Sequence, residues 1–515
     1  MHRRFLIGFL VLGCMISFSA HAENLLQIYQ QALKSDPAFK KAEADWLSAK
    51  QNLPIAQSGT GAPGSGLYPY MDLIGNVGRS YQDITTGNLD ANGYFNSSRY
   101  QISLTQPIFN YATWKSISSA RYTVRAATAT YLASAQDLMY RVVKAYLDVL
   151  NASDQLHFVL AQKKSFLQEL VTTQQKFDVG LIAATGVYDA KASYDRAVAE
   201  EVKDRNDLQN QLENLRAITG ISYTSLMGLN KTIPLTMPKP QRIEQWVSRA
   251  DQQNYFIQSY LYSMLAAREI IKKTAAASYP TVNANAAYGM VNQGYPPTLQ
   301  GPAVGLESTT TRTTNVNLSV DFPLFQGGYV SATTKKAQYQ YLAASDQLEL
   351  MHRDVVKKTR QAYWGVESGI TQIQADQEAI RSARNKLAAT QAGYEVGTRT
   401  MVDVLDAVTE LSRTEEAWAA DRYHYVLSIV ILKQQAGTLS PEDLVSMNRW
   451  FTDPMHFSLH QPIVRSDAGN RPNTASPDAQ AWVGEFTVLP NPLATVEQKQ
   501  PLWVTLPVLP APASD

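Results

Sequence analysis

The sequence predicts long α-helical rods joined to a membrane-spanning β-barrel, in a chain whose architectural unit is present twice. Three observations predict this fold class. Residues 112–178 contain neither proline nor glycine, which favours one very long helix. Four other segments alternate between apolar and polar residues, which is typical of strands. A segment near residue 180 recurs near residue 397, which indicates an internal duplication.

The duplication is visible in two pairs of segments. FDVGLIAATGVYDAKASYDRA begins at Phe177, and YEVGTRTMVDVLDAVTELSRT begins 217 residues later at Tyr394. TQPIFN at Thr105 and DFPLFQ at Asp321 keep nearly the same offset. A long unit that occurs twice usually builds one symmetric architecture. We therefore expect a first repeat over residues 23–235 and a second over residues 236–440.

The N-terminus has the pattern of a secretory signal peptide. Two arginines precede the apolar stretch Phe5–Phe18, and Ala20–Ala22 forms an A-x-A cleavage site. The pattern predicts removal of residues 1–22 and a mature chain that begins at Glu23. Cys14, the only cysteine, lies inside this signal, so no disulfide is expected in the mature protein. Val11–Cys14 also resembles a lipoprotein processing box, so a lipid-anchored chain is an alternative.

Composition narrows the class further. The chain has 46 basic and 45 acidic residues, a balance that argues against nucleic acid as a partner. After the signal, no segment approaches the roughly 18 uncharged apolar residues of a membrane-spanning helix. An exported protein of this kind is soluble, lipidated or an outer-membrane β-barrel.

The alternating segments predict two hairpins, at about residues 68–108 and 280–324. Their strands are expected to be about ten residues long, the length of a tilted strand that crosses a bilayer. The polar, Gly- and Thr-rich connections Asp83–Ser97 and Val291–Thr313 are expected to be exposed loops. Half-buried strands of a soluble sheet are the competing interpretation.

Amphipathic helices are predicted around the hairpins. A helix over residues 112–178 would be roughly 100 Å long, and residues 329–392 mirror it. The shorter helices expected are Thr185–Ile218 and Thr400–Ala436 after the long ones, and about Leu25–Ala56 and Ile243–Ala277 before the hairpins. Their spacing predicts that they pack on one another in water.

The number of strands expected in one chain predicts an oligomer. Open sheet edges do not occur in lipid, and the smallest bacterial barrels have about eight strands. Four strands per chain would therefore close as a dimer of about eight strands or a trimer of about twelve. Residues 441–515 have many prolines and no repeat partner, and we expect a largely flexible periplasmic tail there.

These features together resemble the TolC family of outer-membrane efflux ducts. The segment YEVGTRTMVDVLDA is the most specific part of the resemblance, which extends over about residues 23–450. The resemblance implies a homotrimer in outer-membrane lipid, with one 12-stranded barrel continued by a helical tunnel across the periplasm. It also implies docking on a periplasmic adaptor protein and an inner-membrane pump of the RND, ABC or MFS type. Drugs, small molecules or proteins would leave through the duct, with no enzyme activity and no cofactor.

Two aspartates are the candidate pore constriction. Asp403 and Asp406 are three residues apart, so they share a helix face near a helix N-terminus. Stabilising the helix dipole there is a sufficient structural explanation. The resemblance instead implies that they project into the periplasmic mouth, where three chains would place six carboxylates that attract cations.

The resemblance also implies links that hold the mouth shut. Tyr394 and Arg399 match two of the linking residues, and Thr185 matches a partner of the arginine. The usual acidic partner would fall at Gly186 and is missing, which predicts a weaker gate. A second link falls on Glu169 and Gln391, with the amide and the acid exchanged; a carboxylate can accept from an amide in either direction.

Two turns are the candidate adaptor-docking surface. Val179-Gly180-Leu181 and Val396-Gly397-Thr398 lie between consecutive predicted helices, where glycine permits a tight reversal. The resemblance implies that these turns also meet the adaptor.

No catalytic or metal-binding constellation is recognisable. The mature histidines lack ligand spacing, and the GxGxxG match at Gly59–Gly64 follows a helix and precedes a strand, the reverse of a dinucleotide site. A structural or adhesive coiled-coil trimer with a membrane anchor is the alternative from another class, and a lipid-anchored outlet of a dedicated drug pump is the nearer one.

Overall fold

A computed structural model describes residues 22–59, 61–86, 89–294 and 308–457. The chain divides into two units, Met1–Leu459 and His460–Asp515, and all described residues belong to the first. Residues 1–21 of the predicted signal peptide, which include Cys14, lie outside the described residues, as do one residue of the Gly59–Gly64 segment and the tail from residue 458 onward.

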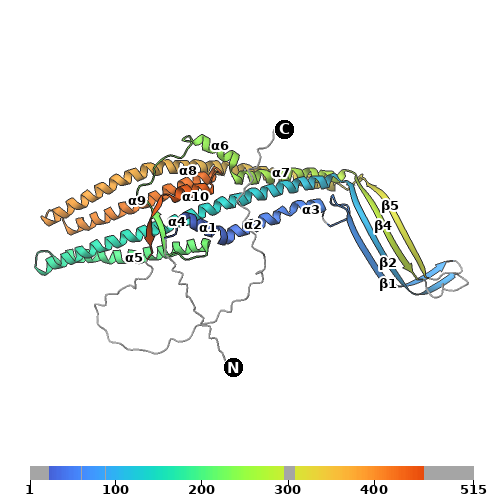
Figure 1. Ribbon diagram of the computed structural model, residues 1–515, viewed down its shortest axis with the longest axis horizontal. Helices are drawn as coiled ribbons and strands as arrows, with labels where there is room; N and C mark the ends of the chain where they lie inside the picture. Colours follow the sequence, from blue (N-terminus) through green and yellow to red (C-terminus); the bar gives the residue numbers. More distant parts are fainter. Residues whose placement is uncertain (1–21, 60, 87–88, 295–307, 458–515) are drawn as a thin grey trace, which may run out of the picture. The chain divides into compact units, whose positions relative to one another are not determined.

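A four-stranded antiparallel sheet contains both predicted hairpins. Its strand order is β1-β2-β4-β5, and its bounds are Tyr70–Thr86 for β1, Leu89–Phe109 for β2, Thr281–Gln293 for β4 and Thr309–Asp321 for β5. Beyond the two hairpins, β2 also pairs with β4. The sheet lies at one end of the described unit, opposite the turns between α4 and α5 and between α8 and α9 (Figure 1).

The strands are longer than expected, and the predicted loops are correspondingly wrong. Residues 83–86 pair with residues 89–92, and residues 93–97 pair with residues 78–82, so these segments are strand rather than an open loop. β4 and β5 extend into the second predicted loop from both sides. Glycine and threonine in these segments suggested loops, but a regular backbone ladder tolerates both residues when pairing continues through them. Only residues 87–88 and 295–307 of these connections lie outside the described part.

One face of the sheet is apolar and exposed. Alternate residues share a face, and paired residues on neighbouring strands point to the same side. On β1, Leu73 and Val77 are 76% and 75% exposed, and on β5, Val316 is 81% exposed. Among the described residues, nothing covers these side chains.

The long helices follow the prediction closely. Their bounds are Tyr111–Asp178 for α4, Ala184–Thr219 for α5, Tyr329–Glu395 for α8 and Met401–Gln435 for α9. Asn110 caps α4 by accepting from the Thr113 backbone N–H, as expected of an N-cap asparagine. No helix in the described part of the chain combines the length and the apolar character needed to cross a membrane.

The helices before the hairpins are interrupted where a single helix was expected. The first group consists of α1 (Leu25–Ser35), α2 (Pro37–Lys50) and α3 (Asn52–Ser58), and the second of α6 (Ile243–Gln253) and α7 (Tyr255–Ala275). Asp36 is extended because it precedes Pro37, and its carboxylate then caps α2 through the Phe39 backbone N–H. Asn254 caps α7 in the same manner.

Residues 441–457 correct the expected flexible tail. Helix α10 spans Pro441–Asn448, and β6 (Phe451–His456) pairs with β3 (Ser225–Leu229) in a separate two-stranded sheet. Leu444, Met447 and Phe451 are buried in the main core, where the Phe451 ring meets Tyr146 edge to face at 5.2 Å. Burying these apolar side chains offsets the entropy of ordering the segment.

A buried arginine ties this small sheet to α9. Arg422 is only 4% exposed, and its guanidinium donates to the carbonyl oxygens of Leu229, at 3.2 Å, and Asn230. Tyr423 beside it donates to Asp154 Oδ2 at 2.7 Å. Burial lowers the pKa of Arg422 and raises the pKa of Asp154. The middle of the helical body is thus its most strongly interlocked region.

Candidate functional site: the helix turns

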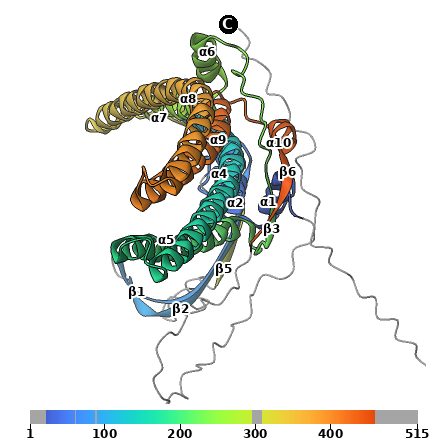
Figure 2. The same ribbon diagram turned by 90° about the vertical axis from the view of Figure 1, so that its left-hand side faces the viewer.

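The sequence-predicted site residues gather at the end of the helical body opposite the sheet. The turn between α4 and α5 and the turn between α8 and α9 lie at the same end (Figure 1). Figure 2 looks onto this end and shows the α4–α5 and α8–α9 hairpins as two adjacent pairs of helices. The expectation that both turns belong to one surface therefore agrees with the fold.

The first turn exposes apolar side chains on a glycine reversal. Gly180 has a φ of 78°, a left-handed conformation that favours glycine. The Leu181 backbone N–H bonds back to the Lys176 carbonyl at 2.9 Å and closes the end of α4. Val179 and Leu181 are 70% and 74% exposed. Exposed aliphatic side chains at a rigid tip are suited to contact a protein partner.

The second turn has the same construction. Gly397 has a φ of 79°, and Val396 before it is 74% exposed. The Thr398 backbone N–H and its hydroxyl both donate to the Gly393 carbonyl, at 2.8 and 3.0 Å. A Cβ on Gly393 would lie 2.8 Å from the Arg399 Cγ, so the arginine stem lies directly over this glycine.

Asp403 and Asp406 differ in their surroundings. Thr400 and Asp403 form a capping box at the start of α9: the Thr400 N–H and hydroxyl donate to Asp403 Oδ2 at 2.8 and 2.9 Å, and the Asp403 N–H donates to the Thr400 hydroxyl. The backbone and side-chain bonds from Thr400 lower the pKa of Asp403. Asp406 is exposed one turn further along α9. Both carboxylates share a face, but Asp403 also stabilises the helix end.

The predicted gate links are not hydrogen bonds within one chain. Among the described residues, no hydrogen bond joins Thr185 to Arg399 or Glu169 to Gln391. The gate links implied by the family resemblance therefore stay a prediction. At Gly186, a Cβ would meet only the Thr173 Cγ2 and Ile182 Cδ1 methyl carbons, at 3.7 and 3.8 Å. A Cβ at this position would therefore make only ordinary contacts with methyl groups.

A lysine that the sequence analysis missed contacts Tyr394. The Lys176 ammonium lies over the Tyr394 ring, 4.4 Å from its centre, and joins α4 to α8. This is a cation–π contact between the two helical hairpins. Burial raises the pKa of Glu169, and the positive charge of Lys176 partly offsets this rise. The sequence signal was available in part, because Glu169 and Lys176 are seven residues apart and share a face of α4.

An apolar cluster lies beneath these polar contacts. Phe166 of α4, Ala197 of α5 and four residues of α9 are buried together, with Tyr394 of α8 packed against them. The α9 members are Met401, Val404, Leu405 and Val408. Because the cluster includes all four helices, it holds the two hairpins together near their turns.

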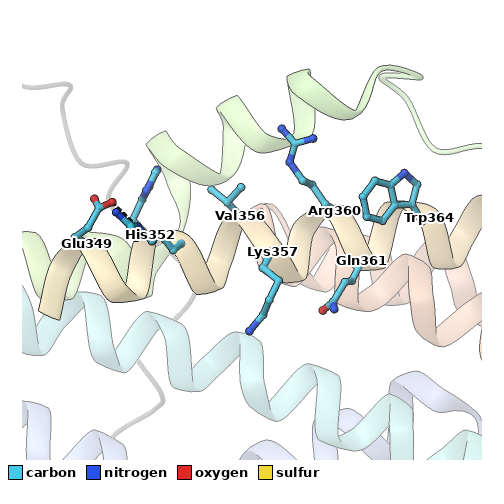
Figure 3. Close-up of a pocket in the computed structure, with 8 residues that line it drawn as sticks. Glu349, His352, Val356, Lys357, Arg360, Gln361 and Trp364 are labelled. Atoms are coloured by element: carbon cyan, nitrogen blue, oxygen red, sulfur yellow. Dashed lines mark hydrogen bonds and ion pairs between the residues drawn. The ribbon is translucent and has the colours of Figure 1, made fainter. Parts of the chain in front are cut away.

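A depression on α8 beside α6 is lined by residues that pair with α6. His352 and Arg360 line it with Trp364 (Figure 3), and they pair with α6 residues Asp251 at 3.0 Å and Glu244 at 3.1 Å. These pairs fasten α6 onto α8. In the described part of the chain, no group of three or more His, Cys, Asp or Glu side chains is arranged to hold a metal ion.

Comparison with known proteins defines the class. Residues 28–221 and 246–438 match the family "Outer membrane efflux protein", so the chain belongs to this family. The Outer membrane protein TolC of Escherichia coli (strain K12) is 35% identical over 453 residues, 87% of this chain and 89% of that protein. The alkaline protease secretion protein AprF of Pseudomonas aeruginosa is 24% identical over 431 residues, 82% of this chain and 86% of that protein.

A solved structure supports the fold. The Campylobacter jejuni CmeC outer membrane channel superposes with a TM-score of 0.68 at 16% identity, over 83% of this chain and 89% of that one. The helix-rich body with strands is therefore the TolC-like channel fold. The predicted family and function are confirmed: the protein is an outer-membrane efflux channel, in a family of channels rather than enzymes.

Proposed function

We propose that three copies of this chain form one duct, with a barrel of twelve strands in the outer membrane and a helical tunnel that extends into the periplasm. The observation that carries the proposal is the open four-stranded sheet. β1 and β5 are its outermost strands, and one face is apolar and exposed. Joining β5 of each copy to β1 of the next removes every edge and turns the apolar face to lipid.

The duplication supports the symmetry of this assembly. The two halves present the same order of elements, and α4 and α8 have 68 and 67 residues. The family also matches two stretches of nearly equal length. Three copies of two similar halves would give a tunnel wall of six similar hairpins. Removal of residues 1–22 by signal peptidase, and an extension into the periplasm, belong to the same proposal.

At the mouth, Asp403 and Asp406 of three copies form the cation-attracting constriction. Their common face on α9 and the exposure of Asp406 support this role. Tyr394, Arg399, Thr185, Glu169 and Gln391 hold the mouth shut, and Lys176 joins them through its contact with Tyr394. The apolar cluster on all four helices supports a closed arrangement in which the hairpins stay together.

The two glycine turns dock a periplasmic adaptor, which couples the duct to an RND, ABC or MFS pump of the inner membrane. The exposed Val179, Leu181 and Val396 side chains support this docking. The cargo is a drug, another small molecule or a protein. The chain belongs to the outer membrane efflux protein family, and one of its relatives is an alkaline protease secretion protein. The choice of cargo then belongs to the pump.

Planar bilayer recording tests the proposed duct. The purified mature protein, added to one side of a lipid bilayer, should insert and conduct in unitary steps with cation preference. Multivalent cations added on the helical side should block the current, because the carboxylate ring lies there. A protein that inserts but conducts without ion preference would contradict the constriction, and one that never conducts would contradict the duct.

A further inference from the structure

The apolar face of the sheet ends in two arginines on the side away from the helices. Arg79 lies on the same row of β1 as Leu73 and Val77, and Arg312 lies on the same row of β5 as Val316. The pairing register places all of these residues on one face of the sheet. Arg79 comes directly after Val77 in its row, whereas Thr314 separates Val316 from Arg312. Through the pairing of β5, β4, β2 and β1, Arg312 is level with Gly75.

Aromatic side chains surround one of these arginines. The Arg79 guanidinium carbon lies 5.1 Å from the centre of the Tyr94 ring, and the Tyr94 and Tyr81 rings are 5.1 Å apart at 62°. Both tyrosines are more than half exposed. Tyrosines that border an apolar band are typical of a membrane–water boundary.

Neither arginine has an anionic partner in the described part of the chain. No ion pair or hydrogen bond to the guanidinium of Arg79 or Arg312 occurs there. The row of Arg79 continues two residues past Tyr81 to Asp83, too far along an extended strand for direct contact with the arginine. Two exposed guanidinium groups on this face are therefore available to an outside anion.

Positive charge is confined to this end of the strands. Residues 70–77, 100–109, 281–289 and 315–321 form the end near the helices and contain no lysine or arginine. The strands themselves thus carry arginine only at the end away from the helices.

We propose that Arg79 and Arg312 bind the phosphate groups of anionic lipids at the membrane surface away from the helices. The inference rests on the proposed function, in which this face contacts lipid. The apolar stem of arginine can lie along the band while its planar fork engages phosphate through two hydrogen bonds. The lipid tails then continue along Leu73, Val77 and Val316.

Lipid preference in reconstituted vesicles tests this inference. The wild-type protein and the variant Arg79→Gln with Arg312→Gln would be placed in phosphatidylcholine vesicles with and without phosphatidylglycerol. Bound lipid would be compared by native mass spectrometry. We expect the wild type to prefer phosphatidylglycerol, and the preference to fall about fivefold for each arginine removed. Each single variant should lose about half of the effect on a logarithmic scale.

Arg99→Gln is the matched control, because Arg99 is exposed on the opposite face of β2. It should retain the preference, and an equal loss in this variant would overturn the proposal. Inorganic phosphate at constant ionic strength should not displace the lipid; displacement would instead indicate a site for free phosphate and also overturn it. Bilayer conductance of the same wild-type protein separates the two proposals. A conducting protein without lipid preference overturns this inference alone, whereas a protein that never inserts overturns the proposed function.

Discussion

At the scale of single residues, the proposed closed mouth would depend on a few polar contacts between hairpins. In the described part of the chain, Lys176 of α4 contacts the ring of Tyr394 of α8 and so joins the two helical hairpins near their turns. The carboxylate that the family resemblance predicts at position 186 is replaced by glycine. Lys176 therefore supplies a link that does not depend on the missing acid, and its removal should loosen the closed mouth.

The first prediction concerns this lysine. Lys176→Gln should shift the resting mouth toward the open state by about two- to fivefold, because an exposed cation–π contact contributes about 0.5–1 kcal/mol. The measurement is resting conductance in a planar bilayer. Lys164→Gln on the same helix α4 is the control, since Lys164 is exposed there. Equal conductance changes in the two variants would show that charge alone, rather than the contact, matters.

The second prediction separates the two aspartates. Asp406→Ala should weaken cation preference without a change in thermal stability, because Asp406 is exposed on α9. Asp403→Ala should weaken the cation preference and also lower Tm, because it removes the carboxylate that accepts two hydrogen bonds from Thr400 at the start of α9. The double variant should abolish block by multivalent cations. Ion selectivity that is unchanged in the double variant would refute the constriction.

The third prediction follows from a buried carboxyl between α5 and α9. Asp204 is 7% exposed, and the described residues provide it with no hydrogen bond or ion pair. Burial and the charge of the neighbouring Glu200 raise the pKa of Asp204. Burial and the charge of Asp204 raise the pKa of Glu416, which lies on the facing helix α9. A raised carboxyl pKa means that the folded state favours the protonated form. Folding is therefore favoured at low pH and disfavoured as pH rises through the raised pKa.

Asp204→Asn should accordingly raise Tm at pH 7 by about 2–4 °C, the shift that roughly 1 kcal/mol produces in a protein of moderate size. The gain should shrink as pH falls toward about 4, where an ordinary aspartate is protonated and the two proteins become alike. Asp207→Asn, at an exposed position of α5, should give a smaller gain, because the charge of Asp207 contributes less than burial and Glu200 to the raised pKa of Asp204. A gain that is independent of pH would refute the explanation.

At the scale of elements, the long helices were the most predictable part of the chain. The predicted end of the first long helix at residue 178 agrees with α4, because its run contains no proline or glycine and its last turn is followed by Val179-Gly180. The Leu25–Ala56 segment was predicted as one helix although Pro37 is present, and the structure breaks there because the residue before a proline is extended. Local signals of this strength predict the ends of helices without knowledge of the tertiary structure.

The C-terminal elements were missed for different reasons. α10 had a readable start, with Ser440, Pro441 and Asp443 in capping positions, but its short length and the absence of a repeat partner concealed it. β6 contains Pro454 and does not alternate, so its pairing with β3, more than 200 residues earlier, could not be inferred locally. The Lys176–Tyr394 contact was missed for the same reason, because it depends on how two distant hairpins pack.

The fourth prediction tests the role of α10 and β6. A chain that ends after Ser440 should be far less stable than one that ends after Phe457, because the segment between them buries Leu444, Met447 and Phe451. Phe451→Ala alone should cost about 3–5 kcal/mol. Thermal unfolding of the purified proteins provides the comparison. Equal Tm values for the two truncated chains would show that these elements do not contribute to the core.

At the scale of the whole molecule, the account depends on one feature that a single chain leaves incomplete. The sheet has two outer strands and an uncovered apolar face, whereas the helical body has a large buried core. The sequence predicted the four strands and excluded closure by one chain. It left dimer and trimer open on strand arithmetic alone, because alternation fixes which face is apolar but not how many copies close the barrel.

The fifth and most direct measurement is disulfide formation between β1 and β5 of neighbouring copies. Cysteine at Asn76 would be combined in turn with cysteine at one of four β5 positions on the same face, Thr313, Asn315, Asn317 or Ser319. The predicted mature chain has no other cysteine, and disulfides form only when Cα atoms are about 4.4–6.8 Å apart. Cysteine at Asn76 with cysteine at Asn285 is the control, because β4 already pairs on both sides.

The account predicts that at least one β5 position gives a covalent trimer, which non-reducing electrophoresis resolves and a reducing agent returns to single chains. The control pair should give single chains only. Covalent dimers with no trimer would indicate a barrel of eight strands. No cross-link at any of the four positions would contradict the closed barrel altogether.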